Sequence, residues 1–177
     1  MFRRGKAPLI LSFVTGLFLL GCTGRPEGVY PVEAFELEKY LGKWYEIARL
    51  DHSFERGLRN VTAEYTLKND GTVGVVNRGY SEAEQGWKVA EGKADFVGRH
   101  DIGHLKVSFF GPFYGSYIIF ELEREAYSYA FVTGPDTSYL WLLARAPQVD
   151  RQVIDQFLDK SKALGFATDG IIFVEQY

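Results

Sequence analysis

The sequence predicts an all-β fold: an eight-stranded antiparallel up-and-down β-barrel, with a C-terminal α-helix packed on the barrel and a short final strand. Two observations predict it. Residues 44–145 alternate apolar and polar positions with period two, in short runs rich in β-branched and aromatic residues with turn residues between them. After Pro147 the spacing of apolar residues changes to that of a helix.

The N-terminal segment predicts export and a lipid anchor. A basic N-terminus is followed by a short apolar run over 9–20, and then by Gly21 and Cys22. This order resembles a bacterial lipoprotein signal, whose processing leaves the cysteine as the lipid-bearing first residue of the mature protein. A transmembrane helix is the alternative, but it needs about 20 apolar residues. We therefore expect a signal peptide over 1–21, a lipidated N-terminus and tether over 22–33, and one domain over 34–177.

The net charge and the cysteine count limit the classes of partner and the chemistry that this chain can have. Removal of residues 1–21 would take away three basic residues and no acidic ones, which changes the net charge from −3 to −6. A chain this acidic has no general attraction to nucleic acid or to anionic lipid, so we expect no nucleic-acid partner. Cys22 is the single cysteine. Once it carries lipid, no thiol remains for a disulfide, a metal site or a nucleophile.

Each strand is expected where an alternating run lies between turn residues. In 60–68, for example, Val61, Ala63 and Tyr65 alternate with polar side chains, and Asn69-Asp70-Gly71 then favours a tight reversal. The expected strands are 44–50, 60–68, 72–80, 87–97, 104–110, 115–123, 127–134 and 138–145. Sequential antiparallel strands can remove their exposed edges by closing into a barrel, and eight strands leave room for side chains and one small ligand.

A helix is expected after Pro147, because apolar residues recur on one helical face between 149 and 164. Asp150 is the expected N-cap, and Gly165 is the expected end. We expect the apolar face to pack on the barrel wall rather than on a membrane. Residues 171–174 then predict a short final strand.

Gly42-Lys43-Trp44, where the barrel begins, resembles the G-x-W signature of the lipocalin family. Three further features agree: Thr133-Gly134-Pro135-Asp136 before the last barrel strand, the run 139–145 in that strand, and the helix after it. With the lipid signal, the chain is similar to bacterial outer-membrane lipocalins. It departs from the family pattern in having Thr133-Gly134 where many members have threonine and aspartate, and in lacking the disulfides of many secreted relatives.

The resemblance implies structural roles for Gly42, Trp44 and Arg145, since in the family the tryptophan plugs the closed end of the barrel and the arginine of the last strand lies across it. It also implies a function: to bind, store or transport small amphiphiles such as fatty acids or lysophospholipids in the bacterial cell envelope. The anchor would then hold the protein in the outer membrane with the barrel facing the periplasm. A homodimer is left open.

Strand alternation gives candidate ligand contacts inside the barrel. Family analogy assigns inward the face of the last strand that carries Trp141 and Arg145. Matching positions on the other strands complete an apolar and aromatic set: Tyr65, Phe109, Tyr117, Tyr129, Phe131 and Trp141. Such a lining suits an acyl chain with a small polar head, although core packing is the alternative at each position. The aromatic loop 109–114 indicates ligand access, membrane contact or a partner surface, unless it folds over its own barrel.

We expect no catalytic residue, no metal and no cofactor. His100 and His104 have no convincing third ligand for a metal. Asp51, His52 and Ser53 have the residue types for acid–base chemistry, but adjacent side chains do not normally converge as a triad. The alternatives to a ligand carrier are a lipid-active enzyme and a structural lipoprotein whose barrel is filled with side chains.

Overall fold

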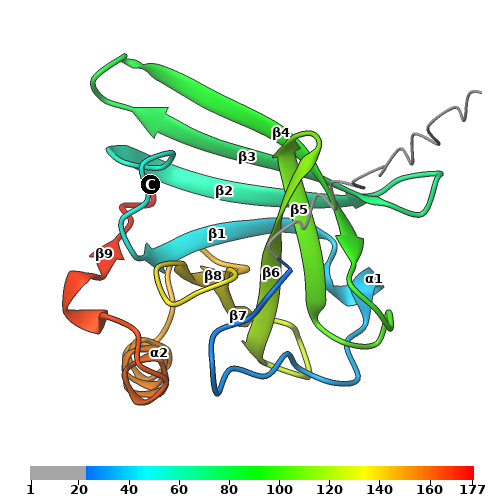
Figure 1. Cartoon of the computed structure of the whole chain (residues 1–177). Helices are drawn as coiled ribbons and strands as arrows, with labels where there is room; N and C mark the ends of the chain where they lie inside the picture. The colour runs from blue at the N-terminus through cyan, green and yellow to red at the C-terminus, as the bar shows by residue number, and fades with distance from the viewer. Residues whose placement is uncertain (1–22) are drawn as a thin grey trace, which may run out of the picture.

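The computed structural model describes residues 23–177, so the predicted signal peptide over 1–21 and the predicted lipidation site Cys22 lie outside the described residues. Eight strands form a closed antiparallel barrel, in which each pairs with the next and β1 pairs with both β2 and β8 (Figure 1). The predicted fold class is confirmed. The strands are β1 (Gly42–Arg49), β2 (Leu58–Leu67), β3 (Val73–Ser81), β4 (Gly86–Phe96), β5 (His104–Phe110), β6 (Phe113–Leu122), β7 (Tyr129–Thr133) and β8 (Leu140–Ala144).

The remaining elements lie at the two ends of the chain. The predicted C-terminal helix is α2 (Arg151–Ala163); Asp150 is its N-cap, though without a side-chain cap hydrogen bond, and Gly165 follows with a φ of 86°. The predicted final strand is β9 (Ile172–Phe173), which pairs with β1. Two short helices were not predicted: α1 (Leu37–Tyr40) and the 3₁₀ helix η1 (Thr168–Gly170).

Two apolar cores hold the fold together. One fills the barrel and includes Trp44, Tyr65 and Ile119. The other lies between the outer barrel wall and α2, where Phe157 is fully buried and its ring packs 5.1 Å from that of Phe131. The strands beneath α2 are therefore apolar on both faces. Burial of Phe157 explains why the amphipathic helix docks here.

The segment before the barrel packs more closely than the sequence predicted. Val29 is fully buried against the helix side of the barrel. The backbone N–H of Val32 donates to the Ile119 carbonyl at 2.8 Å, and the Gly103 N–H donates to the Val32 carbonyl at 2.8 Å. The prediction of a tether over 22–33 is therefore wrong in its second half, because the valines near its end supply enough apolar surface to dock. Turn residues alone gave no sign of this.

Strand β1 contains a bulge that determines what faces the barrel interior. Glu46 pairs with Leu143 and Arg49 pairs with Trp141, and the register shifts between Glu46 and Ala48. Because residues opposite each other on antiparallel strands share a face, Glu46 and Arg49 both face inward, as Leu143 and Trp141 do. The extra residue places both Ile47 and Ala48 in the outer core.

The C-terminal segment seals the wall where β1 and β2 separate. The Val174 N–H donates to the Ile47 carbonyl at 2.9 Å. The side-chain amide of Gln176 donates to the carbonyls of Glu46 at 2.7 Å and Val61 at 2.9 Å. In Figure 1 the C-terminus accordingly lies beside the start of β2. These bonds satisfy backbone groups that β1 and β2 no longer satisfy for each other.

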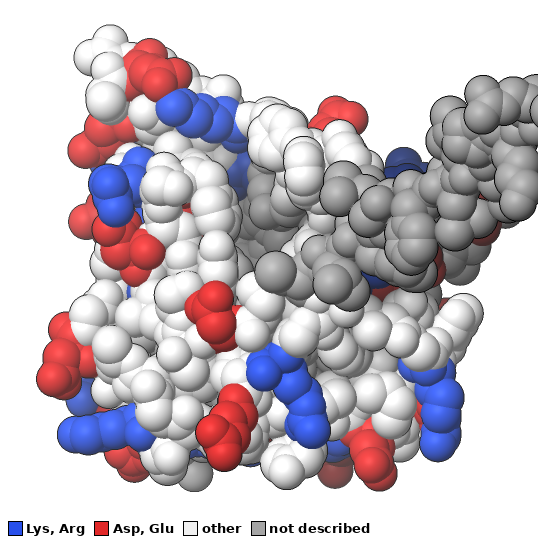
Figure 2. Space-filling model, in the orientation of Figure 1, with Lys and Arg blue, Asp and Glu red and all other residues white. Residues whose placement is uncertain are grey.

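Acidic and basic side chains are interspersed on the face shown in Figure 2. Among residues 23–177, no helix has the length and the hydrophobicity required to cross a membrane.

Candidate ligand-binding site

A tryptophan and an arginine close one end of the barrel. Trp44 is fully buried, and its indole N–H donates to the Tyr40 carbonyl of α1 at 2.8 Å. The guanidinium of Arg145 lies 4.0 Å from the centre of the Trp44 ring and donates to three backbone carbonyls, those of Lys39, Leu41 and Lys43. Gly42 has a φ of 89°, which favours glycine at the turn from α1 into β1. This geometry is the one that the family resemblance implied for the closed end.

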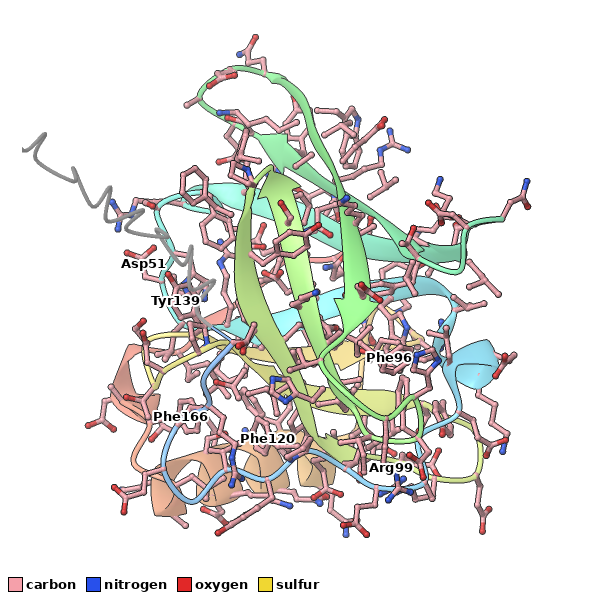
Figure 3. The ribbon with its side chains drawn as sticks, turned by 45° about the vertical axis from the view of Figure 1, so that its right-hand side comes forward. Asp51, Phe96, Arg99, Phe120, Tyr139 and Phe166 are labelled. Carbon is pink, nitrogen blue, oxygen red and sulfur yellow. The ribbon has the colours of Figure 1, made fainter. Side chains whose placement is uncertain are left out.

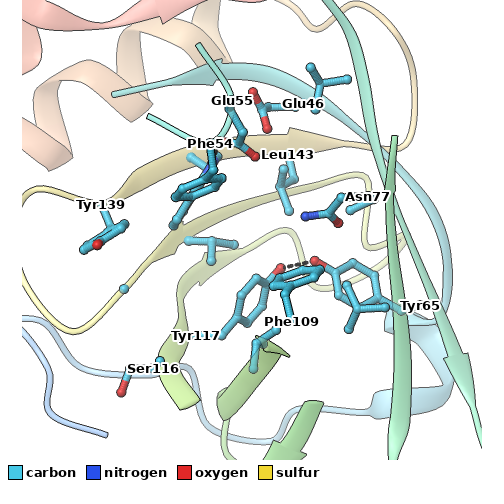
Figure 4. Close-up of a pocket in the computed structure, with 18 of the residues that line it drawn as sticks. Glu46, Phe54, Glu55, Tyr65, Asn77, Phe109, Ser116, Tyr117, Tyr139 and Leu143 are labelled. Atoms are coloured by element: carbon cyan, nitrogen blue, oxygen red, sulfur yellow. Dashed lines mark hydrogen bonds between the residues drawn. The ribbon is translucent and has the colours of Figure 1, made fainter. Parts of the chain in front are cut away.

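A cavity of about 430 Å³ occupies the barrel interior above this plug (Figure 4). Its inner part is aromatic and apolar, and its outer part is formed by the β1–β2 and β7–β8 loops through Phe54, Pro135, Asp136 and Tyr139. Asp51 and Tyr139, at this outer end, lie on the opposite side of the barrel from Phe96 and Arg99 in Figure 3. The volume is within the range of small-molecule sites.

Four of the six predicted contact residues line this cavity: Tyr65, Phe109, Tyr117 and Trp141. They come from β2, β5, β6 and β8, so alternation together with the family analogy identified the inward face correctly on these strands. The polar groups of the two tyrosines and the tryptophan already form hydrogen bonds with other side chains of the protein. Tyr117 hydrogen bonds with Tyr65 at 2.8 Å and with Tyr40 at 2.7 Å, and the Trp141 indole N–H donates to Glu55 Oε2 at 3.1 Å.

The prediction that Tyr129 and Phe131 face inward is wrong. Both pack on the outer side of the barrel: Phe131 is fully buried in the core beneath α2, and the Tyr129 hydroxyl donates to Gln156 on that helix at 3.2 Å. The register explains the error, since Val132 pairs with the inward-facing Trp141 and lines the cavity. Both faces of β7 are apolar because the helix covers one of them, so hydrophobicity alone could not tell the faces apart.

Buried charges form one side of the cavity, and the sequence analysis missed them. Arg49 Nη1 lies 2.6 Å from Glu46 Oε1, and the two side chains are only 2% and 5% exposed. Arg49 Nη2 also donates to the Glu55 carbonyl at 2.8 Å, which holds the β1–β2 loop over the barrel. In Figure 4, Glu46 and Glu55 lie together, across the cavity from Tyr65, Tyr117 and Phe109. Glu46 follows Trp44 by two positions, so alternation could have placed it inward, whereas Glu55 is on a loop and gave no signal.

Burial sets the protonation of these groups. Burial raises the pKa of Glu46 well above its usual range, and the neighbouring Glu55 carboxylate raises it further, while Arg49 opposes both effects. Burial also raises the pKa of Glu55, which the hydrogen bond from Trp141 and the charge of Arg49 offset in part. Desolvation thus dominates at both carboxyl groups.

His52 belongs to an aromatic stack at the outer end of the cavity. Its ring lies 4.7 Å from that of Trp141, 5.1 Å from that of Tyr139 and 5.3 Å from that of Phe54. Burial, with a smaller effect of Arg49, lowers the pKa of His52 to about 4. Asp51 instead pairs with Arg56 at 2.6 Å, so these neighbours do not converge on one another. Within residues 23–177, no three His, Cys, Asp or Glu side chains gather as metal ligands.

The aromatic loop 109–114 divides between the cavity and the surface. Phe109 lines the cavity, whereas Phe110 and Phe113 are 81% and 72% exposed. The tip therefore does not fold over its own barrel. It presents two phenylalanine rings at the same end of the barrel as the β1–β2 and β7–β8 loops.

Gly134 explains one departure from the family pattern. A Cβ atom at this position would lie 2.8 Å from the Cβ of Tyr139, which is closer than real side chains approach. The preceding Thr133 donates from its hydroxyl to the Tyr139 carbonyl at 2.7 Å. Glycine thus lets the β7–β8 turn bring Tyr139 to the cavity.

The chain is similar to known proteins over most of its length. The model of the lipocalin-like domain matches residues 35–176. The outer membrane lipoprotein Blc of Vibrio cholerae serotype O1 is 61% identical over 94% of this chain and 98% of its own length. The outer membrane lipoprotein Blc of Escherichia coli strain K12 is 44% identical over 96% of each chain. Among solved structures, insecticyanin from Manduca sexta matches with a TM-score of 0.69 at 19% identity, covering 87% of each chain, which shows the shared fold.

Proposed function

Because this chain belongs to the lipocalin family, we propose that it binds single-chain amphiphiles such as fatty acids or lysophospholipids in its barrel and stores or carries them in the bacterial cell envelope. The cavity is the observation that carries this proposal. It offers about 430 Å³, lined mainly by apolar and aromatic side chains with a few polar groups. This combination suits an acyl chain whose head is held by hydrogen bonds.

The protein is an outer-membrane lipoprotein, as are the relatives that match it over almost its whole length. We propose Cys22 as the lipidated residue, since it follows the apolar run directly. Pro26 and Val29 are already buried, which leaves a short connection to that anchor, so the barrel would lie close to the membrane on its periplasmic side. Phe110 and Phe113 would then be available to meet lipid near the cavity.

Two alternatives have less support. A structural lipoprotein with a barrel filled by side chains does not account for a cavity of this size. A lipid-active enzyme needs a nucleophile beside a base, whereas His52 stacks among aromatic rings and Asp51 pairs with Arg56. The family also indicates binding rather than catalysis.

Native mass spectrometry tests the proposal. The protein would be stripped of lipid, exposed to an extract of envelope lipids and measured again. We expect one amphiphile per barrel, with a mass that identifies its class, and the same spectrum reports whether the protein is a homodimer. A protein that retains no lipid under these conditions would contradict the proposed function.

A further inference from the structure

The walls of the cavity carry acidic groups without basic ones. Glu46, Glu55 and Asp136 line it, while no Lys, Arg or His side chain does so among the described residues. Glu46 and Glu55 lie together on one side of the cavity, across from Tyr65 and Tyr117 (Figure 4). Asp136 belongs to the β7–β8 loop at its outer end. The charged residues whose side chains a head group could contact on the cavity wall therefore carry carboxyl groups.

Arg49, the cation that pairs with Glu46, is already engaged. Arg49 is 2% exposed; its Nη1 binds Glu46, and its Nη2 binds the carbonyls of Glu55 and Leu58, at 2.8 and 3.4 Å. Freeing this guanidinium for a ligand would leave Glu46 buried without its partner and would release the β1–β2 loop. Because both changes are costly, Arg49 is a poor receptor for an anionic head.

The carboxyl oxygens, in contrast, can accept more hydrogen bonds. In the described part of the chain only two N–H donors reach the four oxygens of Glu46 and Glu55: Arg49 Nη1 and Trp141 Nε1. An ionised carboxylate can accept about four hydrogen bonds. The phenol groups across the cavity mainly bind one another, through the Tyr40, Tyr117 and Tyr65 hydroxyls. The site is thus richer in acceptors than in donors.

An ammonium head matches this arrangement. It brings three N–H donors, and its positive charge favours the ionised form of the two carboxyl groups, which burial otherwise disfavours. A carboxylate head would add another negative charge to the same enclosed space and would find no basic partner there.

We propose that the cavity selects single-chain amphiphiles with an ammonium head over those with a carboxylate head, and that Glu55 is the main specificity-determining residue. This inference rests on the proposed function, because it concerns the same cavity. Glu55 is the residue to test, since Glu46 is needed to neutralise the buried Arg49.

Three probes with the same alkyl chain test the proposal: dodecylamine, dodecanol and dodecanoic acid. The full-length protein in a non-ionic detergent would be offered all three together. The probes released from the purified complex would then be separated by gas chromatography and quantified by mass spectrometry. Comparing the ratio of amine to alcohol between variants cancels the partition of probes into the micelles. Bound dodecanol also reports that the cavity is intact.

We expect the wild-type protein to retain the amine in preference to the acid. Glu55→Gln keeps an oxygen that can accept from Trp141 but removes the charge, so the ratio of amine to alcohol should fall about tenfold or more. Glu64→Gln removes the same charge from an exposed position on β2 and should leave the ratio unchanged.

The outcomes separate the two proposals. A wild-type preference for dodecanoic acid would overturn the inference, even if Glu55→Gln does not fold, and so would an unchanged ratio in folded Glu55→Gln. Binding of the probes without this selectivity would leave the proposed function intact. Failure of all three probes to bind would overturn the proposed function and the inference with it.

Discussion

Replacing Trp44 and Arg145, separately and together, tests how the closed end of the barrel is held. Trp44→Ala should lower the free energy of unfolding by about 3–5 kcal/mol, because a fully buried indole leaves a cavity and the Tyr40 carbonyl loses its donor. Arg145→Ala should cost about 1–3 kcal/mol. It removes a cation–π contact of about 0.5–2 kcal/mol, while water can replace part of the hydrogen bonding to three carbonyls.

The double variant measures the contact between the two side chains. Because the guanidinium lies 4.0 Å from the ring centre, the two single effects should overlap by about 0.5–2 kcal/mol. Urea unfolding of residues 23–177, followed by far-ultraviolet circular dichroism, gives the four free energies. Trp44→Phe is the control that keeps a ring without the N–H and should cost less than Trp44→Ala. Equal and negligible shifts for Trp44→Ala and Arg145→Ala would refute the plug.

Cys22→Ser should leave the fold unchanged and abolish stable membrane association, because each buried methylene of the lipid contributes about 0.8 kcal/mol; fractionation that still finds the variant in the outer membrane would contradict the anchor. Trp141→Ala should weaken binding of a single-chain amphiphile by about 1–3 kcal/mol, as measured by calorimetric titration, through loss of its aromatic surface on the cavity. Phe131→Ala, outside the barrel, should instead destabilise the fold by about 3–5 kcal/mol and leave the ligand affinity unchanged. Reduced affinity in a folded variant would contradict the placement of this ring outside the cavity. The pKa of His52 is about 4 in the folded protein and 6.5 when unperturbed, so the unfolded chain binds the proton more readily and stability should fall as pH decreases from about 6.5 to about 4. His52→Phe should flatten this slope in urea midpoints, and an equally steep slope would show that other groups cause it.

Most of the fold could be predicted because each strand obeys a local rule. The predicted bounds of β5 agree with the structure. Period two, with the inward face of the last strand assigned by family analogy, placed Tyr65, Tyr117 and Trp141 on the cavity side. The change of period after Pro147 predicted α2 in the same way. These signals are local, because a strand with one solvent-exposed face and one buried face can be recognised from the alternation of its own residues.

The prediction failed where two apolar environments compete for one strand. β7 lies between the barrel interior and α2, so Ala130 and Val132 on its inner face are as apolar as Phe131 on its outer face, and hydrophobicity did not show which face was inward. The inward position of Arg49, three residues after the inward-facing Glu46, depends on the bulge in β1, which simple alternation does not describe. Glu55 lies on a loop and reaches the cavity beside Trp141, which donates to it from 86 positions away, and Val29 docks on surfaces formed far along the chain.

The pairing of β1 has a consequence for the order of folding. Tyr45 pairs with Ala144, and the Glu46 carbonyl is bound by Gln176, which is 130 positions away. The first strand therefore has no complete set of neighbours until almost the whole chain is present. Contacts of such long sequence separation slow folding, because the chain entropy is lost before the contacts form. We expect the hairpins from β2 to β6 to form early, and the barrel to acquire its ligand-binding interior only in the last step, when both ends of the domain meet at β1.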